Sequence, residues 1–383
     1  MIRALVALTY LGFIYGLLGL APTTATAQSQ SSSIRDSIPQ SRLQERSWFG
    51  NWSLGLATGH LRDEFNQDTF VRSRLQLSIE RTYFSRLQLK IQPSLQAHTG
   101  HLQNESDAEA NRGSVFIREG SANLLWNQEF LDSARPALSL GAIDQSRLHS
   151  PLLLDALPFP TLSADLKYLT LQQSVVTSGA LTTQTKEFEK TPLFSAAGLQ
   201  HQFRSGRIKA GGRLQYFAFQ DLPQSIATRS GLLGNSTRSV NNVDSDFIYA
   251  YRGYSADVNL NLRVTPRTSV ELQALAIQNT VAPQGLNGAY SLKAGVGQIF
   301  QRVWKVTPSY EFFRVEPDAT VASLTSSIYN TNRVGYRAGA EVEHRRYFKM
   351  GFFAGQRESI FESPSQRREG FFELRLETKN EPI

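Results

Sequence analysis

Residues Tyr254 to Val264 read YSADVNLNLRV, and this stretch decides the fold. Tyr, Ala, Val, Leu, Leu and Val take every second position, while Ser, Asp, Asn, Asn and Arg fill the positions between them. Successive side chains of an extended strand point to opposite faces. The stretch is therefore predicted to be a β-strand with one apolar face and one polar, charged face.

The same alternation recurs along the chain from Trp48 onward, in the runs 71–80, 86–97, 333–343 and 372–377. Strands of soluble proteins average about 5 or 6 residues, whereas a tilted strand needs roughly 9 to 11 residues to cross a bilayer. Several of these runs reach the longer length. Aromatic residues such as Trp126, Phe300 and Trp304 fall near the predicted strand ends, where a membrane protein places rings at the headgroup level.

The N-terminus predicts export. Arg3 precedes an uncharged apolar run from Ala4 to Leu20, and Ala25-Thr26-Ala27 forms a cleavage site, so residues 1–27 are predicted to be a signal peptide. An uncleaved anchor is the alternative. Residues 28–47, rich in Ser, Gln and Arg, are predicted to be a disordered periplasmic leader.

Composition excludes several classes. The chain has no cysteine, which excludes disulfides and a lipid-modified N-terminal cysteine. The net charge of +7 is spread along the sequence, and together with export this argues against nucleic acid as a partner. The mature chain also lacks an apolar run long enough for a membrane-spanning helix.

The connections between the predicted strands alternate between long and short. Long ones lie near 60–68, 99–112, 177–191, 221–245, 280–286, 316–331 and 359–367; short ones lie near 82–84, 128–135, 204–206, 265–267, 301–303 and 345–347. The alternation fails once, at 144–163. Splitting that segment into a strand over 149–157, a turn over 158–161 and a strand over 162–176 gives sixteen strands. If the segment folds as a plug or cap instead, fourteen strands are expected.

In these features the chain resembles Gram-negative porins as a class: a signal peptide, alternating strands, aromatic strand ends and unequal connections. The resemblance covers roughly 48–379 and implies an all-β, antiparallel, up-and-down transmembrane barrel in the outer membrane. Outer-membrane lipid and small polar solutes are then its expected partners, and the same resemblance implies a homotrimer. One departure is the C-terminal tail, 380–383, because many such barrels end on an aromatic residue.

A barrel of about sixteen strands is too wide for side chains to fill, so its polar face is expected to line a water-filled lumen. The predicted pore-lining residues are Arg72, Arg74, Arg86, Lys90, Lys209, Arg213, Arg263, Arg333, Arg337, Lys349, Arg375, Glu341 and Glu373. Basic residues outnumber acidic ones on this face, which favours small anions. The alternative is that these charges pair across strands and fill space.

Two segments are candidates for a constriction, 221–245 and 144–161. The residues predicted to take part are Asp144, Arg147, His149, Asp155, Arg229 and Arg238. The run Ser150-Pro151-Leu152-Leu153-Leu154 is apolar enough to pack against the barrel wall. The alternative for 221–245 is an ordinary exposed loop that takes no part in a constriction.

No catalytic residue, metal site or cofactor is predicted. His98 and His101 form a weak metal pair with no cysteine nearby, and His60 lies next to acidic residues without a nucleophile motif. The predicted function is passive diffusion of small polar solutes. The alternatives are a barrel hydrolase with a rim histidine, a plugged structural or surface-binding barrel, and a secreted soluble all-β protein.

Overall fold

The structure is a computed structural model that describes residues 49–62, 67–83, 87–100, 111–125, 137–155, 158–166, 169–176, 191–241, 244–363, 366, 368–378 and 381–382. The predicted signal peptide and leader lie outside these residues. Within the part of the chain that is described, no helix is long and apolar enough to cross a membrane.

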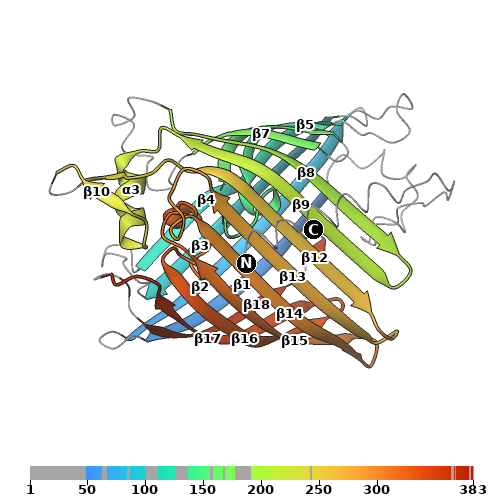
Figure 1. Cartoon of the computed structure of the whole chain (residues 1–383). Coiled ribbons are helices and arrows are strands. Elements are labelled where there is room, and N and C mark those ends of the chain that lie inside the picture. The colour runs from blue at the N-terminus through green and yellow to red at the C-terminus, as the bar shows by residue number, and fades with distance from the viewer. Residues whose placement is uncertain are drawn as a thin grey trace, which may run out of the picture. The chain divides into compact units, whose positions relative to one another are not determined.

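Sixteen antiparallel strands form one closed barrel (Figure 1). They are β1 (Phe49–Arg62), β2 (Gln67–Tyr83), β3 (Leu87–Gly100), β4 (Asn111–Leu125), β5 (Ala137–Asp144), β6 (Pro158–Leu166), β7 (Leu169–Val175), β8 (Leu193–Ser205), β9 (Ile208–Gln220), β12 (Arg252–Arg263), β13 (Thr268–Asn279), β14 (Gly288–Phe300), β15 (Trp304–Val315), β16 (Arg333–His344), β17 (Phe348–Ser359) and β18 (Glu369–Thr378). Each strand pairs with its neighbours in the chain, and β1 pairs with β18 from Gly55↔Glu377 to Arg62↔Gly370. This closure satisfies the backbone groups that an open sheet edge would leave unpaired.

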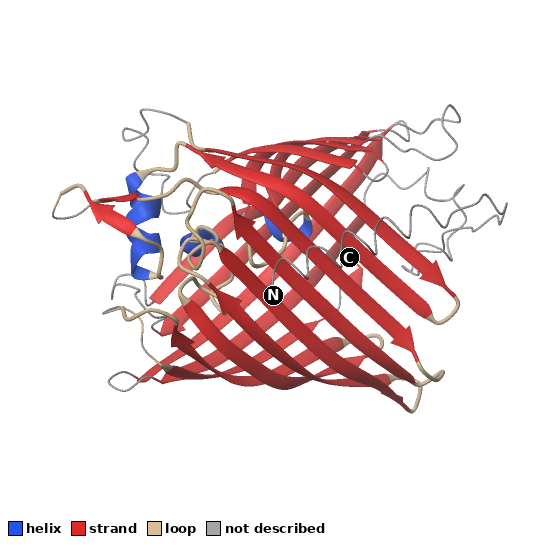
Figure 2. Cartoon of the chain, in the orientation of Figure 1, coloured by secondary structure: helices blue, strands red, loops and turns tan. Residues whose placement is uncertain are grey.

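Smaller elements decorate the barrel. Between β9 and β12 lie the helix α3 (Gln224–Leu232) and the hairpin β10 (Thr237–Ser239) with β11 (Ser245–Phe247). The short helical turns η2 (Gln145–Arg147) and η4 (Ala322–Leu324) lie in other connections, and Figure 2 shows the helices in blue among the red strands. In the predicted C-terminal tail, β19 (Glu381–Pro382) pairs with Asn51 and Trp52 of β1.

The alternation predicted from sequence is the inside–outside alternation of the barrel. Apolar side chains such as Leu272, Tyr310 and Phe352 are exposed on the outer face, while intervening residues such as Glu311 and Phe353 are buried inside. This apolar outer surface suits lipid, and the polar inner surface suits water.

The predicted count of sixteen strands is confirmed, but the predicted division of 144–163 is wrong. Residues 145–155 are helical turn and loop, and β6 begins at Pro158, where a tight turn was expected. The single strand predicted over 162–176 is divided between β6 and β7, which keeps the total at sixteen. Leu152, Leu153 and Leu154 are all fully buried, and three consecutive apolar residues cannot alternate between lipid and lumen as a barrel strand requires. The prediction that an inward-folded segment would leave only fourteen strands was also wrong. Residues 145–155 fold inward, but 158–166 still form β6.

Candidate functional site

Two connections fold inward and pack together inside the barrel; we call them the inward loops (145–155 and 316–332). Asp155 N donates to Leu324 O at 2.8 Å, and Ser326 N donates to Pro151 O at 3.1 Å, so backbone hydrogen bonds join the two. Their buried apolar side chains form a core with inward-facing residues of the wall. Its members include Leu152, Leu153, Leu154, Phe194, Phe217, Ile277, Phe313, Val321 and Leu324.

Polar contacts fix the first inward loop to the wall. His149 lies between two glutamines, with Nε2 2.7 Å from Gln172 Oε1 on β7 and Nδ1 3.2 Å from Gln215 Oε1 on β9. Arg213 Nη1 donates to Leu148 O at 2.6 Å, and Asp144 accepts from Ser146 N at the start of η2. Burial lowers the pKa of the His149 side chain from 6.5 to about 4, so the ring is neutral at neutral pH.

The second inward loop is held by a buried charge cluster at the start of β18. Glu369 forms ion pairs with Arg333 and with Arg357, and all three side chains are buried. Arg357 Nη1 also donates to Ser327 O at 2.6 Å and to Ile328 O at 3.0 Å. The cluster therefore ties the loop backbone to three strands of the wall, β16, β17 and β18.

Further contacts fix both ends of the same loop. Tyr329 donates its hydroxyl to Glu311 Oε1 at 2.6 Å. Near the beginning of the loop, Tyr251 Oη donates to Asp318 Oδ1 at 3.0 Å, and Ser236 N donates to the same oxygen at 3.0 Å. Burial raises the pKa of the Asp318 carboxyl above its usual value.

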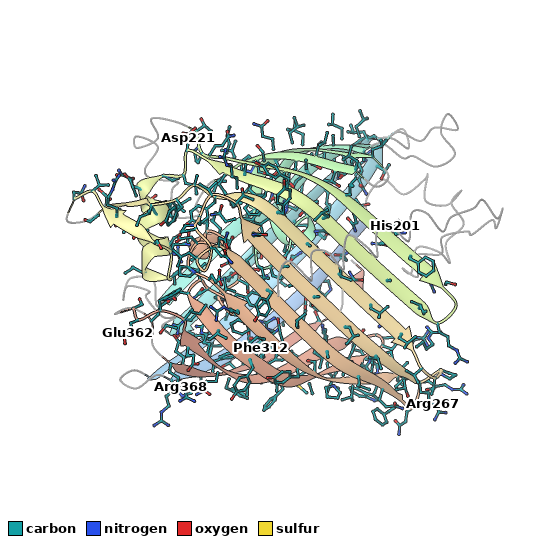
Figure 3. All side chains as sticks on the ribbon, viewed as in Figure 1. His201, Asp221, Arg267, Phe312, Glu362 and Arg368 are labelled. Carbon is teal, nitrogen blue, oxygen red and sulfur yellow. The ribbon has the colours of Figure 1, made fainter. Side chains whose placement is uncertain are left out.

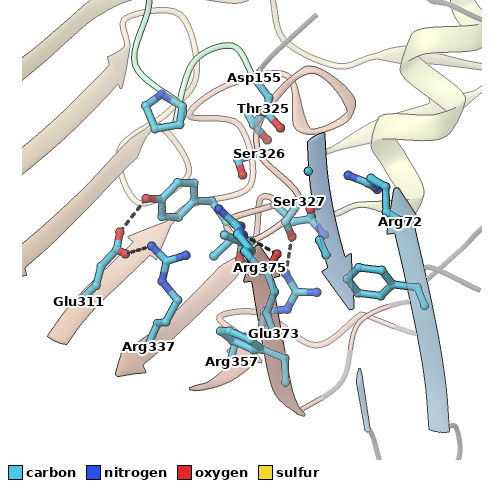
Figure 4. A pocket seen from close by; sticks show the side chains of 18 of the residues that line it. Arg72, Asp155, Glu311, Thr325, Ser326, Ser327, Arg337, Arg357, Glu373 and Arg375 are labelled. Atoms are coloured by element: carbon cyan, nitrogen blue, oxygen red, sulfur yellow. Dashed lines mark hydrogen bonds and ion pairs between the residues drawn. The ribbon is translucent and has the colours of Figure 1, made fainter. Parts of the chain in front are cut away.

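A cavity of about 770 Å³ lies between the inward loops, the end of α3 and the wall formed by β1, β2 and β13–β18 (Figure 4). Its charged lining residues are the basic Arg72, Arg74, Arg229, Lys293, Arg337, Arg357 and Arg375 and the acidic Asp155, Glu311, Glu373 and Glu377. Ser326, Ser327 and Asn330 contribute polar groups from the loop side. Volume and lining suit a small, hydrated, polar solute.

The charges in the cavity are unequally paired. Glu311 accepts from Arg337, and Glu373 accepts from Arg375 Nε at 2.7 Å, as the dashed lines in Figure 4 show. Arg72 Nε is buried without a hydrogen-bond partner among the described residues, and neither Arg229 nor Lys293 forms an ion pair with a described residue. On the acidic side, Asp155 and Glu377 likewise form no ion pair with a described residue, so the cavity offers charge of both signs with an excess of basic groups.

The structure brings part of the predicted set together. Arg72, Arg74, Arg337, Arg375 and Glu373, together with Asp155 and Arg229 from the predicted constriction, line the cavity.

The rest of the predicted set lies elsewhere. Asp144 and His149 are buried in the anchoring of the first inward loop, and Arg238 is exposed on β10. Lys90 pairs with Glu119, Arg213 with Asp257, Arg333 with Glu369 and Lys349 with Glu341. Lys209 and Arg263 are exposed at the ends of β9 and β12 next to the short turns. Arg86 and the side chain of Arg147 lie outside the described residues.

Lys293, Glu311 and Arg357 were not among the predicted site residues, and the inward fold of 316–332 was not predicted. Lys293 and Glu311 continue the alternation of their strands, so the period-two pattern contains the signal for them. Of the candidate histidines, His60 contacts Thr69 Oγ1 at 3.0 Å and does not line the cavity, while the side chains of His98 and His101 lie outside the described part.

No protein-family model matches the chain, and no curated protein matches it in sequence. Solved structures do match. OprB of Pseudomonas putida at high pH matches with a TM-score of 0.53 and 11% identity, over 88% of this chain and 96% of that one. OmpT with loop L8 deleted, an outer membrane protein of Vibrio cholerae, matches with a TM-score of 0.49 and 8% identity, over 87% and 99%. OmpF of Salmonella typhi in complex with daunomycin matches with a TM-score of 0.46 and 9% identity, over 86% of this chain and 97% of that one. The likeness to OprB confirms the predicted class of fold.

Proposed function

We propose that this protein is an outer-membrane channel through which small polar solutes diffuse passively, with a preference for anions. One observation carries the proposal: the 770 Å³ cavity inside a closed sixteen-strand barrel, lined by more basic than acidic side chains. An inward loop that narrows a wide barrel to such a cavity is a means of selecting solutes by size and charge.

The location and the assembly belong to the same proposal. The apolar outer face and the fold shared with OprB support the outer membrane, reached through cleavage of residues 1–27. A homotrimer remains part of the proposal through the resemblance to porins. We propose no covalent chemistry, because passive diffusion requires only the shape and charge of the lumen.

The experiment is conductance in planar bilayers with a KCl gradient, which gives the anion-to-cation permeability ratio from the reversal potential. Two arginines at roughly 7 Å from a permeating ion in a water-like dielectric each stabilise an anion by about 0.6 kcal/mol, before screening. Arg72→Gln with Arg74→Gln is therefore expected to lower the ratio about two- to fivefold. Arg238→Gln, which removes an exposed charge outside the cavity, is the matched control and should leave the ratio unchanged.

A second function is favoured by the apolar core of the inward loops, which fills one side of the barrel. A plugged barrel that displays its connections would insert without conducting. Discrete conductance steps support the channel, and insertion without any conductance contradicts it in favour of the plugged barrel.

A further inference from the structure

Four consecutive short turns at one end of the barrel carry an unusual charge. They are 204–209, 263–267, 301–305 and 345–349, which we call the basic rim. The rim contains no Asp or Glu and ten basic residues: Arg204, Arg207, Lys209, Arg263, Arg267, Arg302, Lys305, Arg345, Arg346 and Lys349. Figure 3 labels Arg267 at the tip of the turn between β12 and β13, where it projects from the barrel end.

The four turns form one continuous edge. Arg263 N donates to Arg207 O at 2.8 Å, Ile299 N donates to Arg267 O at 2.7 Å, and Arg345 N donates to Val303 O at 2.8 Å. The first and third of these hydrogen bonds join one turn to the next, and the second joins the turn 263–267 to the end of β14, which leads into the turn 301–305. The charges therefore sit side by side on a shared edge and act on the same partner.

The charge that is not neutralised concentrates at the tips of the turns. On the strand side, Lys305 pairs with Glu271 at 2.5 Å and Lys349 pairs with Glu341 at 2.9 Å. The tip residues Arg207, Arg267, Arg302 and Arg346 are all exposed, and none forms an ion pair with a residue that the structure describes. Each turn thus presents at least one guanidinium beyond the strand ends.

Exposed apolar side chains lie within four residues of these arginines in the chain. Phe203, Phe300 and Tyr347 are 49%, 50% and 58% exposed, and Val264 is 47% exposed in the remaining turn. Rings with one apolar and one wet side prefer the headgroup level of a bilayer. Arginines immediately beyond that level are placed at the lipid phosphates, for which the guanidinium is a bidentate donor.

The opposite end of the same strands has a different charge. The connections 221–251, 280–287, 316–332 and 360–368 contain the basic residues Arg229, Arg238, Arg367 and Arg368 against the acidic Asp221, Asp244, Asp246, Glu316, Asp318 and Glu362. The excess of positive charge is therefore confined to the end with short turns.

We propose that the basic rim binds the phosphate groups of anionic phospholipids in the leaflet that surrounds this end of the barrel. Charge complementarity and the apolar side chains beside the tips favour a lipid over an acidic soluble protein, which would need no apolar belt. The proposal goes beyond the channel function, and its test does not depend on conduction.

The test is native mass spectrometry of the full-length protein, folded in detergent and titrated with phosphatidylglycerol or phosphatidylcholine of equal chain length. The unmodified protein is expected to retain phosphatidylglycerol at least about fivefold more strongly than phosphatidylcholine. One basic residue near an anionic lipid surface contributes about 1 kcal/mol, which corresponds to this factor. R207Q/R302Q/R346Q should lower this preference to near unity. The matched control R238Q/R252Q/R368Q removes three exposed arginines of the opposite end and should keep it.

Equal retention of the two lipids by the unmodified protein would overturn the proposal. So would an equal loss in the rim and control variants, which means nonspecific attraction. Rim-dependent binding of polyglutamate without a lipid preference would also overturn it and indicate an acidic protein partner. Circular dichroism and resistance of the folded barrel to sodium dodecyl sulfate show whether each variant is folded.

Discussion

Glu369→Gln is the sharpest test of how the second inward loop is held. The side chain of Glu369 is 2% exposed, and it forms ion pairs with Arg333 and Arg357, whose side chains are 0% and 5% exposed. The amide keeps the size of the side chain but removes its charge. Both arginines then stay buried without this counter-charge.

Breaking a buried ion pair by removing one partner costs about 3–5 kcal/mol, because the remaining charge is left in a low dielectric. With a urea dependence of roughly 3 kcal/mol per M, the unfolding midpoint of the folded barrel is expected to fall by about 1–2 M. The assay is urea unfolding from lipid vesicles, followed by tryptophan fluorescence.

Glu341→Gln is the matched control. Its pair with Lys349 is 29% and 45% exposed, and exposed pairs contribute at most about 1 kcal/mol. An equal shift of the midpoint in the two variants would refute the reasoning, because it would show that burial of the Glu369 cluster adds nothing.

Two further predictions concern the anchors of the inward loops. The pKa of His149 is about 4 in the folded protein and about 6.5 in the unfolded chain, so the unfolded state takes up the proton first as the pH falls. The free energy of unfolding is therefore unaffected by this histidine above pH 6.5 and decreases as the pH drops towards 4. Between pH 7.5 and 5 the unmodified protein should lose about 2 kcal/mol more than His149→Gln in urea unfolding, and parallel losses would contradict this assignment. Tyr329→Phe removes a hydrogen bond to the carboxylate of Glu311 and should cost about 1.5–3 kcal/mol in the same assay; a change near zero would mean that the hydroxyl does not hold the loop.

The barrel was predictable from sequence because every strand repeats the same physical requirement. A residue that faces lipid must be apolar, and its neighbour faces the lumen, so stretches such as 254–264 record the position of the wall directly. The same rule found Arg72, Arg74, Arg337 and Arg375 on the lumen face. The residues that form the wall of the candidate site can therefore be predicted from the alternation, and this includes Lys293 and Glu311, which were overlooked.

The inward loops were only half predictable, and the reason is the kind of contact that holds them. The sequence indicates that residues 150–154 are buried, because a run of three leucines outside the alternation has to be removed from water. Residues 316–332 contain no comparable run, and contacts with distant residues hold them inside the barrel. Arg357 binds the loop backbone and pairs with Glu369, Glu311 accepts from Tyr329, and Tyr251 donates to Asp318. Those pairings join residues 12 to 67 positions apart, so no local pattern encodes them. If the channel selects its solutes at this cavity, its selectivity depends on a loop whose position follows from tertiary pairing and not from its own sequence.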